Sequence, residues 1–322
     1  MQSQIRLSQS VQELLCCPIC HAKLKRALEQ FECTNSECAA YFPIVDGIPV
    51  LINEKSSVFS VDDFVSHRKT FFGNNSENKL KKTIRRLIPT ISENIKRNSN
   101  YSRMSHVLLG QSISPRVLVI GGSILGQGME SLVENTAIDL VESDVAFGSR
   151  TMLICDAHDI PFEDGSFDGV IVQAVLEHVV DPYRCCEEIH RVLKEQGVVY
   201  AETPFMQQVH AGRYDFTRFT HLGHRRLFRR FEEIDSGAVC GPGMALAWSY
   251  QYFLVSFTTS RILRALLRDF ASLTSFYLKY LDYYLINKPG AFDAASGYYF
   301  MGRKAEQVLS DQDLIKLYKG AE

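Results

Sequence analysis

The sequence lacks a long apolar run, an apolar leader and an excess of charge of one sign. The apolar stretch 244–260 contains Ser, Gln and Thr and is shorter than the ~20 apolar residues of a membrane-spanning helix. Residues 1–10 are polar, unlike a secretory signal. Lys and Arg total 35 against 37 Asp and Glu, a net charge of −2, which excludes a globally basic nucleic-acid-binding protein. We therefore expect a cytoplasmic protein with no membrane span.

Four of the nine cysteines form two close pairs near the N-terminus. Cys17, Cys20, Cys33 and Cys38 follow the spacing C-x2-C-x12-C-x4-C, and two such pairs can bring four thiolates into a tetrahedron around zinc. Residues 24–31 between the pairs are long enough for a short hairpin. Cys16 leaves the first ligand ambiguous. Because four thiolates leave no open coordination position, we expect a structural zinc that supplies much of the segment's folding free energy.

Residues 14–52, including the run 41–51, resemble the small zinc-ribbon proteins that activate tRNA and protein methyltransferases. The resemblance implies a zinc-ribbon domain over residues 1–53 that works beside a methyltransferase. Residues 54–115 have helical rather than strand character, and we interpret them as a helical connector that also forms a lid. Basic residues at 79–86, 96–97 and 103 indicate either a solvated helix face or a contact with a phosphate-bearing substrate, RNA or an anionic membrane.

A short apolar strand and a glycine-rich turn open the remainder of the chain. Residues 116–120 have the character of a buried parallel strand, and the glycine-rich run 121–128 leads into a helix that starts at about residue 129. Further strands are predicted over 137–142, 152–157, 166–173 and 197–202, with a helix over 181–193. Strands that alternate with helices indicate a doubly wound parallel α/β sheet.

Six segments of this region together resemble the class I S-adenosylmethionine-dependent methyltransferases of the type 11-like group. They are residues 117–128, 141–142, 156–162, 166–168, 175–179 and 192–197, with a weaker match at 297–304 as the last strand. The resemblance implies a Rossmann-like methyltransferase domain over 116–322 that binds S-adenosylmethionine. It also implies roles for Gly121, Gly122 and Gly126 around the methionine end of the cofactor, Glu142 at the ribose, Asp156 with Ala157 at the adenine, and Gln173 at the sulfonium.

The glycine turn departs from the family pattern in two ways. The acid that precedes the first glycine is Val119 here, and the usual Gly-x-Gly is interrupted between Gly122 and Gly126. The change is compatible with weaker cofactor binding, with another partner such as Asp144, or with a relative that no longer binds cofactor. In the last case the chain would be a non-catalytic scaffold.

Two histidines are the candidates for catalysis. His178 follows the fourth strand, and His210 lies in a loop after the fifth strand, where the sheet's carboxyl ends form a ligand crevice. This loop, 203–220, resembles a motif of methyltransferases associated with sugars and surface polysaccharides. His210 would then act as a base, with Tyr214, Asp215 and Arg218 orienting the acceptor, although an Asp215–Arg218 pair that merely pins the loop is the alternative.

A catalytic metal is not expected from the sequence. Some related methyltransferases place a metal at an E-x-x-E-H pattern, but the first position here is Ala174, which leaves only Glu177 and His178. Four arginines at 225–230 indicate either a solvated face or a contact with a phosphate-bearing acceptor. Apolar residues at helical spacing over 245–286 predict an inserted pair of helices within about 245–290 that packs in the core, forms a homodimer or contacts a membrane peripherally.

These features together predict an S-adenosylmethionine-dependent methyltransferase with a structural zinc. The acceptor expected from the 203–220 loop is a small molecule or glycan, namely a hydroxyl of a sugar or polysaccharide precursor. An rRNA or tRNA methyltransferase is the enzymatic alternative, since some rRNA methyltransferases also join a zinc ribbon to this fold. Against RNA, the chain is not basic overall and has no evident base-stacking motif.

Overall fold

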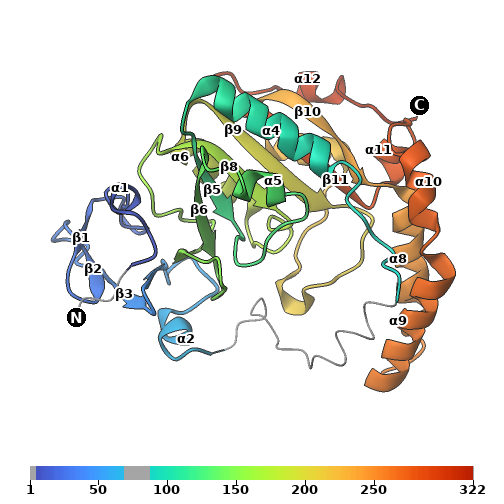
Figure 1. Cartoon of the computed structure of the whole chain (residues 1–322), viewed down its shortest axis with the longest axis horizontal. Helices are drawn as coiled ribbons and strands as arrows, with labels where there is room; N and C mark the ends of the chain where they lie inside the picture. The colour runs from blue at the N-terminus through green and yellow to red at the C-terminus, as the bar shows by residue number, and fades with distance from the viewer. Residues whose placement is uncertain (1–4, 69–87, 322) are drawn as a thin grey trace.

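One continuous sheet organises the molecule (Figure 1). The computed structural model describes residues 5–68 and 88–321, so the basic residues at 79–86 lie outside the described part of the chain. The strand order within the described residues is β1-β2-β3-β4-β7-β6-β5-β8-β9-β11-β10. The strands are β1 (Leu24–Arg26), β2 (Gln30–Cys33), β3 (Tyr41–Val45), β4 (Ile48–Leu51), β5 (Arg116–Ile120), β6 (Asp139–Asp144), β7 (Leu153–Cys155), β8 (Phe167–Gln173), β9 (Leu193–Pro204), β10 (Phe231–Cys240) and β11 (Gly297–Lys304).

The central strands have the doubly wound arrangement that the sequence predicts. Strands β7, β6, β5, β8 and β9 are parallel, and β11 inserts antiparallel between β9 and β10. Strand β5 pairs with β6 on one side and with β8 on the other. The chain therefore reverses its direction of winding at β5, and a crevice for a ligand is expected outside the carboxyl ends of these strands.

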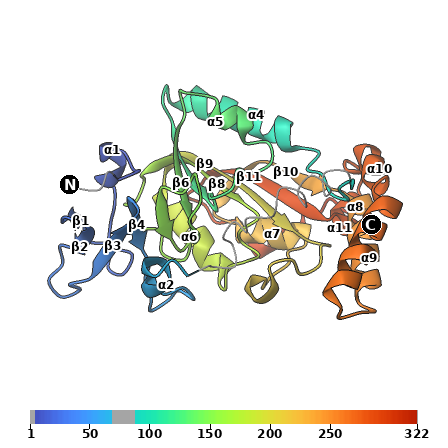
Figure 2. The ribbon, with the colours of Figure 1, turned by 60° about the horizontal axis from the view of Figure 1, so that its bottom comes forward.

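Helices cover both faces of this sheet, as Figure 2 shows. Helices α4 (Arg97–Gln111) and α5 (Glu130–Val133) lie on one face, and α6 (Pro182–Val192) and α7 (His221–Leu227) lie on the other. A hydrophobic core lies on each face of the sheet, and successive side chains of β5 point into opposite cores. Val119 packs in the core that contains Tyr101 of α4, whereas Leu118 packs in the core that contains Ile189 of α6. Period-two burial of this kind is what a strand covered on both faces requires.

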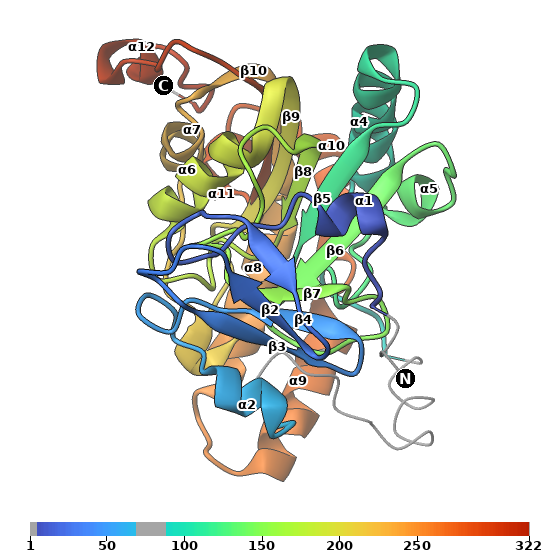
Figure 3. The same cartoon turned by 90° about the vertical axis from the view of Figure 1, so that its left-hand side faces the viewer.

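The N-terminal segment extends the sheet at the β7 edge (Figure 3). The predicted hairpin is present as β1 and β2, and β3 and β4 continue the antiparallel meander. Strand β4 then pairs parallel with β7, with Val50 opposite Ile154. Phe31 and Phe42 belong to the same buried cluster as the α6 face of the sheet. The segment thus shares both backbone pairing and a core with the rest of the chain, and short helices α1 (Gln9–Gln12) and α2 (Val61–Val65) flank it.

Three helices, not the predicted pair, form the C-terminal addition at the end of the molecule opposite β1–β4 (Figure 1). They are α8 (Pro242–Val255), α9 (Arg261–Ser275) and α10 (Leu278–Leu285). A turn at Phe276 and Tyr277 separates α9 from α10, and it interrupts an apolar periodicity that continues on both sides. Short helices α11 (Ala291–Ala294) and α12 (Asp311–Ile315) flank β11. Within 5–68 and 88–321, every helix is too short or too polar to cross a membrane.

Candidate functional site

The four predicted cysteines of the N-terminal segment converge. Sγ of Cys17 lies 3.8 Å from Sγ of Cys38, and Sγ of Cys20 lies 3.4 Å from Sγ of Cys33. Four sulfurs around a zinc ion at ~2.3 Å are separated by about 3.8 Å, so the donor set fits zinc. Cys16 is buried outside this cluster, which resolves the ambiguity about the first cysteine. The cluster can therefore bind zinc.

The glycine turn after β5 forms one wall of a cavity at the carboxyl ends of β5, β6, β7 and β8. Gly121 has φ +81°, and a Cβ there would lie 2.5 Å from Cγ2 of Val175. A Cβ on Gly126 would lie 1.9 Å from Oε1 of Gln173. The left-handed φ therefore requires glycine at position 121, whereas a side chain at position 126 would displace the amide of Gln173.

Asp144, not Glu142, is the acid of β6 that reaches this cavity. Asp144 lines the cavity and accepts a hydrogen bond of 2.9 Å from the backbone N–H of Ser123 in the glycine turn. Glu142 lies behind the turn, where its carboxylate binds Nε of Arg150 at 2.7 Å. Burial raises the pKa of Asp144 and, with Arg150 opposing, that of Glu142. Asp144 thus supplies a carboxylate at the glycine turn, where the family has an acid at the position of Val119. The sequence analysis names Asp144 as one such alternative partner.

Asp156 and Ala157 also line the cavity, together with a segment that the sequence analysis missed. Oδ1 of Asp156 lies 2.5 Å from Nδ1 of His158, and its Oδ2 accepts a 2.6 Å bond from Ser57. Although burial opposes ionisation, the bonds from His158 and Ser57 hold the pKa of Asp156 below its ordinary value. Phe59 beside Ser57 forms part of the wall. No local signal in residues 54–60 indicates this role, because the preceding strand β4 brings them to the sheet.

Gln173 at the end of β8 separates this cavity from a second one and lines both. Its Nε2 donates to Glu202 at 2.8 Å, and its Oε1 accepts from the hydroxyl of Tyr101 at 3.2 Å. Glu202 is fully buried and also accepts from Asn94 at 2.8 and 2.9 Å. Burial raises the pKa of Glu202, although these donors oppose the shift. The network fixes the amide of Gln173 in one orientation.

The second cavity draws its walls from distant parts of the chain and has polar groups among a largely apolar lining. Its lining residues outside the glycine turn include Ser92, Asn94, Gln173, Glu177, Glu202, Thr203, His210 and Ser296. Glu177 and His178 lie in the turn after β8, and His210 lies in the loop after β9. The two histidine rings are 4.9 Å apart at 78°. The structure thus brings the two predicted catalytic histidines together and adds Glu177 to them.

Glu177 is the most unusual group of this cavity. Its side chain is 1% exposed, and neither carboxylate oxygen has a hydrogen-bond partner. Burial raises the pKa of Glu177 to about 8. Burial, reinforced by the proximity of His210, lowers the pKa of His178 to about 4, and burial also lowers that of His210. At neutral pH both rings are therefore uncharged and can accept a proton or bind a cation.

Asp215 and Arg218 hold the loop that carries His210. Oδ2 of Asp215 accepts from Nη2 of Arg218 at 2.8 Å and from the backbone N–H of His210 at 2.9 Å. Arg218 further donates to the carbonyl of Gln207 at 2.8 Å. These bonds lower the pKa of Asp215 to about 2 against the effect of burial. Their arrangement matches the alternative in which the pair pins the loop.

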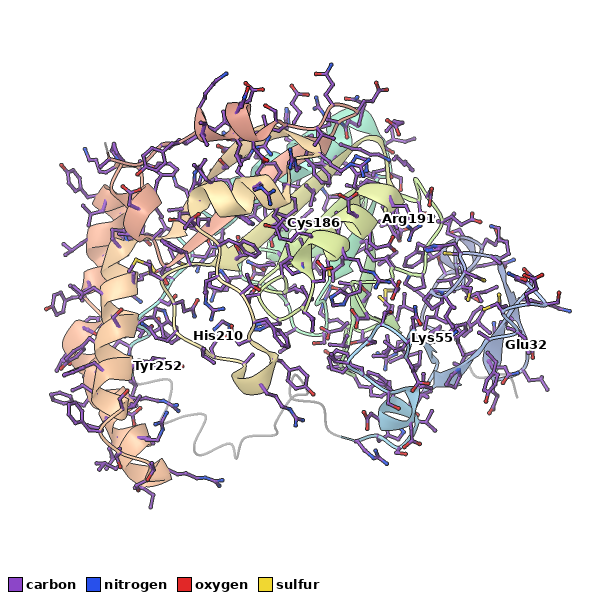
Figure 4. All side chains as sticks on the ribbon, turned by 180° about the vertical axis from the view of Figure 1, so that it is seen from behind. Glu32, Lys55, Cys186, Arg191, His210 and Tyr252 are labelled. Carbon is purple, nitrogen blue, oxygen red and sulfur yellow. The ribbon has the colours of Figure 1, made fainter. Side chains whose placement is uncertain are left out.

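Two contacts link this loop to neighbouring segments. Tyr214 stacks on Phe59 with ring centroids 5.7 Å apart. In Figure 4, His210 lies between the sheet and helix α8, which carries Tyr252. The hydroxyl of Tyr252 donates to the carbonyl of Val209 at 2.5 Å. The connector and α8 therefore hold the His210 loop from both sides.

The arginines at 225–230 lie away from both cavities and contact other parts of the protein. Arg225 is buried, with Nε 3.1 Å from Glu233, and Arg230 pairs with Glu187. Oδ1 of Asp311 lies 3.3 Å from Nε of Arg226 and 3.4 Å from Nη1 of Arg229. Their positive charges are thus matched by carboxylates on α6, β10 and α12.

Part of the chain matches a known family. Residues 122–201 match the family described as a methyltransferase domain. A ubiquinone/menaquinone biosynthesis C-methyltransferase UbiE from Citrifermentans bemidjiense is 38% identical over 52 residues, which are 16% of this chain and 22% of that protein. A demethylmenaquinone methyltransferase from Clavibacter sepedonicus is 44% identical over 63 residues, 19% of this chain and 25% of that protein. The matches span about a quarter of the length of these relatives.

Solved structures resemble the chain more distantly. A putative sarcosine dimethylglycine methyltransferase from Galdieria sulphuraria covers 65% of this chain and 84% of its own at 16% identity and a TM-score of 0.41. A chain of the complex between the Haloferax volcanii Trm112 methyltransferase activator and a putative methyltransferase covers 66% and 91% at 16% identity and a TM-score of 0.40. Likeness of this extent has no bearing on function. Residues 122–201 are therefore similar to a methyltransferase domain, and they include the turn and the central strands described above.

Proposed function

We propose that this protein, which carries a class I methyltransferase domain, transfers a methyl group from S-adenosylmethionine to a hydroxyl of a sugar or polysaccharide precursor. The observation that carries the proposal is the cluster of Glu177, His178 and His210 beside the glycine turn, in which Glu177 and His210 line the second cavity and His178 lines the first. Groups that accept protons are needed when the acceptor is a hydroxyl, since its proton must leave.

The chain's own residues fit the cofactor in the first cavity. Gly121, which lines this cavity, would lie at the cofactor's methionine end, with Gly122 next to it in the turn and Gly126 on the side of the second cavity. Asp144 would bind the ribose hydroxyls in place of Glu142. Asp156 and Ala157 would meet the adenine. When bound, the cofactor supplies a methyl group on a positively charged sulfur. Gln173, fixed by Glu202, would lie beside that sulfur at the junction of the two cavities, where the acceptor oxygen must approach the methyl group.

The reaction needs an acceptor oxygen aligned with the methyl group. The oxygen forms a bond to the methyl carbon, the carbon–sulfur bond breaks, and its electron pair stays on sulfur to give S-adenosylhomocysteine. The hydroxyl proton leaves the acceptor at the Glu177–His178–His210 cluster. Polar groups along the cavity, such as Ser92, Asn94 and Thr203, suit the remaining hydroxyls of a sugar, and positioning by them supplies much of the acceleration.

A lipid acceptor is the second candidate, because the apolar surface of α8–α10 favours it. Large apolar side chains on these helices and in the turn between α8 and α9 are exposed, with Ile262 of α9 at 77% and Phe257 of the turn at 74%. Arg261 and Arg268 lie among them on α9, and mixed aromatic, apolar and basic side chains suit a membrane surface. The relatives named above are a ubiquinone/menaquinone biosynthesis C-methyltransferase and a demethylmenaquinone methyltransferase. A lipid-linked saccharide would place its lipid on this surface and its sugar among the polar groups of the second cavity.

The acceptor can be identified by methylation with labelled S-adenosylmethionine. Purified protein is offered nucleotide sugars, lipid-linked saccharides, demethylated quinones and stripped rRNA in parallel, with His210→Ala as the matched control. We expect label in a methyl ether of a saccharide. Label in a quinone ring carbon or in rRNA, with none in saccharides, would replace the sugar proposal.

The membrane contact has its own test. We expect sedimentation of the protein with anionic phosphatidylglycerol vesicles, and at least a tenfold loss of binding in Ile262→Glu/Leu266→Glu. Phosphatidylcholine vesicles are the control for charge. A concentration-dependent dimer that the same substitutions dissociate, without vesicle binding, would assign the surface to a homodimer.

We also propose that Cys17, Cys20, Cys33 and Cys38 bind one structural zinc in a ribbon resembling the methyltransferase activators. Four converging thiolates in a small segment support this. Elemental analysis should find zinc in the wild type and lose one equivalent in Cys33→Ser. Retention of all zinc by that variant would contradict the assignment.

A further inference from the structure

Three lone-pair donors lie close together where the two cavities adjoin. Oε1 of Glu177 lies 3.7 Å from Nε2 of His178 and 3.9 Å from Nε2 of His210. The three donor atoms all lie within 4.8 Å of one another. Glu177 and His210 line the second cavity and His178 lines the first, so this point lies at the boundary between cofactor and acceptor.

The hydrogen bonds of the two rings decide what faces Glu177. Nδ1 of His178 lies 2.9 Å from the carbonyl oxygen of Tyr214, which can only accept, so Nδ1 carries the proton. Nδ1 of His210 lies 3.3 Å from the carbonyl of Gln208 and 3.5 Å from a carboxylate oxygen of Asp215, both acceptors. Each neutral ring therefore directs the lone pair of its Nε2 toward the carboxylate of Glu177.

Such a cluster can hold either a proton on Glu177 or a cation among its three donors. Glu177 is fully buried, and its two oxygens have no hydrogen-bond partner in the described structure. Buried carboxylates are normally paired with a charge or coordinate a metal. Ligand–metal bonds of ~2.0–2.2 Å for nitrogen and oxygen place two ligands of one ion roughly 3–4 Å apart, which is the range of the two Glu177–histidine distances.

We propose that Glu177, His178 and His210 bind one divalent transition-metal cation through Oε1, Nε2 and Nε2. Two neutral imidazoles and a carboxylate suit borderline cations such as Zn²⁺, Ni²⁺ and Fe²⁺, and three protein ligands leave coordination positions open. The carbonyls of Tyr214 and Gln208 and the carboxylate of Asp215 fix the rings in the ligating tautomer. This site differs from the cysteine cluster in place, donors and openness.

The E-x-x-E-H pattern does not indicate this cation, because that pattern takes all its ligands from the turn after β8. Ala174 removes a carboxylate from the turn after β8, but the third donor comes from His210 after β9. The pinning of that loop by Asp215 and Arg218 places His210 opposite Glu177. Asp215 and Arg218 are therefore positioning residues of the cation site.

On the proposed function, the open positions would bind the acceptor oxygen. A hydroxyl bound to a cation releases its proton to water more readily. The resulting alkoxide then forms the bond to the methyl carbon as the carbon–sulfur bond breaks and its electron pair stays on sulfur. Nε2 of His210 then acts as a ligand and not as the base that the sequence predicted.

Calorimetric titration of the zinc-loaded full chain with Ni²⁺ tests the site. Ni²⁺ is the probe because imidazole suits it, whereas a tetrahedral four-thiolate site suits zinc. We expect one Ni²⁺ per chain, a loss of affinity of about 10-fold or more in Glu177→Gln, and 100-fold or more in His178→Ala/His210→Ala. His106→Ala, which removes an exposed histidine of α4, is the matched control and should bind as the wild type does.

The outcomes separate the site from the reaction. No saturable Ni²⁺ binding, or equal binding by the double-histidine variant, would overturn the site and indicate that a proton occupies the cluster. If saccharide methylation persists when the only metal left in the protein is the cysteine-bound zinc, the reaction does not need a cation at this cluster, and the proposed function still stands. Saturable binding by the cluster without saccharide methylation would keep the cation and reject the hydroxyl acceptor.

Discussion

The two adjoining cavities share Gly121 and Gln173 but are assembled differently. The first cavity, called the cofactor cavity from its proposed role, is lined mainly by residues at the ends of successive strands, and each of these residues is close in sequence to a recognisable motif. The second cavity, called the acceptor cavity from its proposed role, combines the segment just before α4, the turn after β8, the loop after β9 and the end of β10. A cavity of the first kind can be recognised from local sequence, whereas one of the second kind exists only after folding.

The cavities also differ in how their carboxylates are satisfied. Asp144 and Asp156 in the first accept hydrogen bonds from Ser123 and Ser57, whereas Glu177 in the second accepts none. Satisfied acceptors provide a fixed frame for a ligand that is bound but not chemically changed at that point. A carboxylate left without donors beside two neutral histidines is instead available for a proton or a cation, which is what activation of an acceptor requires.

The largest expected effect tests this division directly. His210→Ala should lower turnover by about 100-fold or more and leave the dissociation constant for S-adenosylhomocysteine unchanged, because His210 lines only the acceptor cavity. Single-turnover methylation and calorimetry measure the two quantities. His106→Ala serves as the control. Near-normal turnover would remove His210 from the mechanism, and equal loss of cofactor affinity would show that the cavities are not separable.

The next effect concerns the cofactor side. Asp144→Asn should weaken cofactor binding by about 10-fold or more, since hydrogen bonds to a charged group contribute roughly 1.5–3 kcal/mol. The matched variant Glu142→Gln, two residues earlier on β6, should change affinity by less than about threefold, because Glu142 binds Arg150 outside the cavity. The reverse order in calorimetry would restore the ribose role predicted for Glu142.

Much of the fold follows from residues close together in sequence. The runs of buried residues at β5 and β8, the turn at Gly121 and the strand at β11 carry local signals of pattern and turn chemistry. The cysteine spacing likewise predicted which four sulfurs would meet. These features depend on short-range geometry, so the sequence contains them.

The rest depends on how segments meet in three dimensions. Glu142 and Asp144 are both acids of one strand, and only the length of β6 decides which of them reaches the cavity. Ser57 and Phe59 have no motif and reach the cofactor cavity because β4 pairs with β7. The meeting of Glu177 with His210 requires the loop after β9 to fold back, which no local pattern encodes.

A third prediction concerns the acid stability of the acceptor side. The loop that carries His210 runs into α7, where burial lowers the pKa of His224 to about 3. Since the unfolded value is near 6.5, the unfolded state binds this proton first, and stability falls as the pH drops below about 6.5 toward 3. At pH 5.5 the loss is about 1.4 kcal/mol for this group. Urea unfolding of His224→Leu should show a correspondingly shallower decline in the free energy of unfolding between pH 7 and 5.5.

His106→Ala provides the comparison for that decline, because it removes a histidine exposed on α4. Its pH dependence should follow the wild type. If the free energy of unfolding of His224→Leu declines with pH as steeply as that of the wild type, then His224 is not held neutral in the folded state, and the acid instability arises from other groups.

The smallest effect tests whether the N-terminal segment contributes to the cofactor cavity. Ser57→Ala removes the 2.6 Å bond to Asp156, and one hydrogen bond contributes roughly 0.5–1.5 kcal/mol, so cofactor affinity should fall about threefold with little change in turnover at saturation. Ser56→Ala is the matched control, because the adjacent hydroxyl binds Asp159, which lies outside the cavity lining. If both variants weaken the cofactor equally, the whole connector supports the cavity and the local bond does not. If neither does, the cofactor cavity is complete without the segment that β4 brings to it, and the pairing of β4 with β7 contributes only stability.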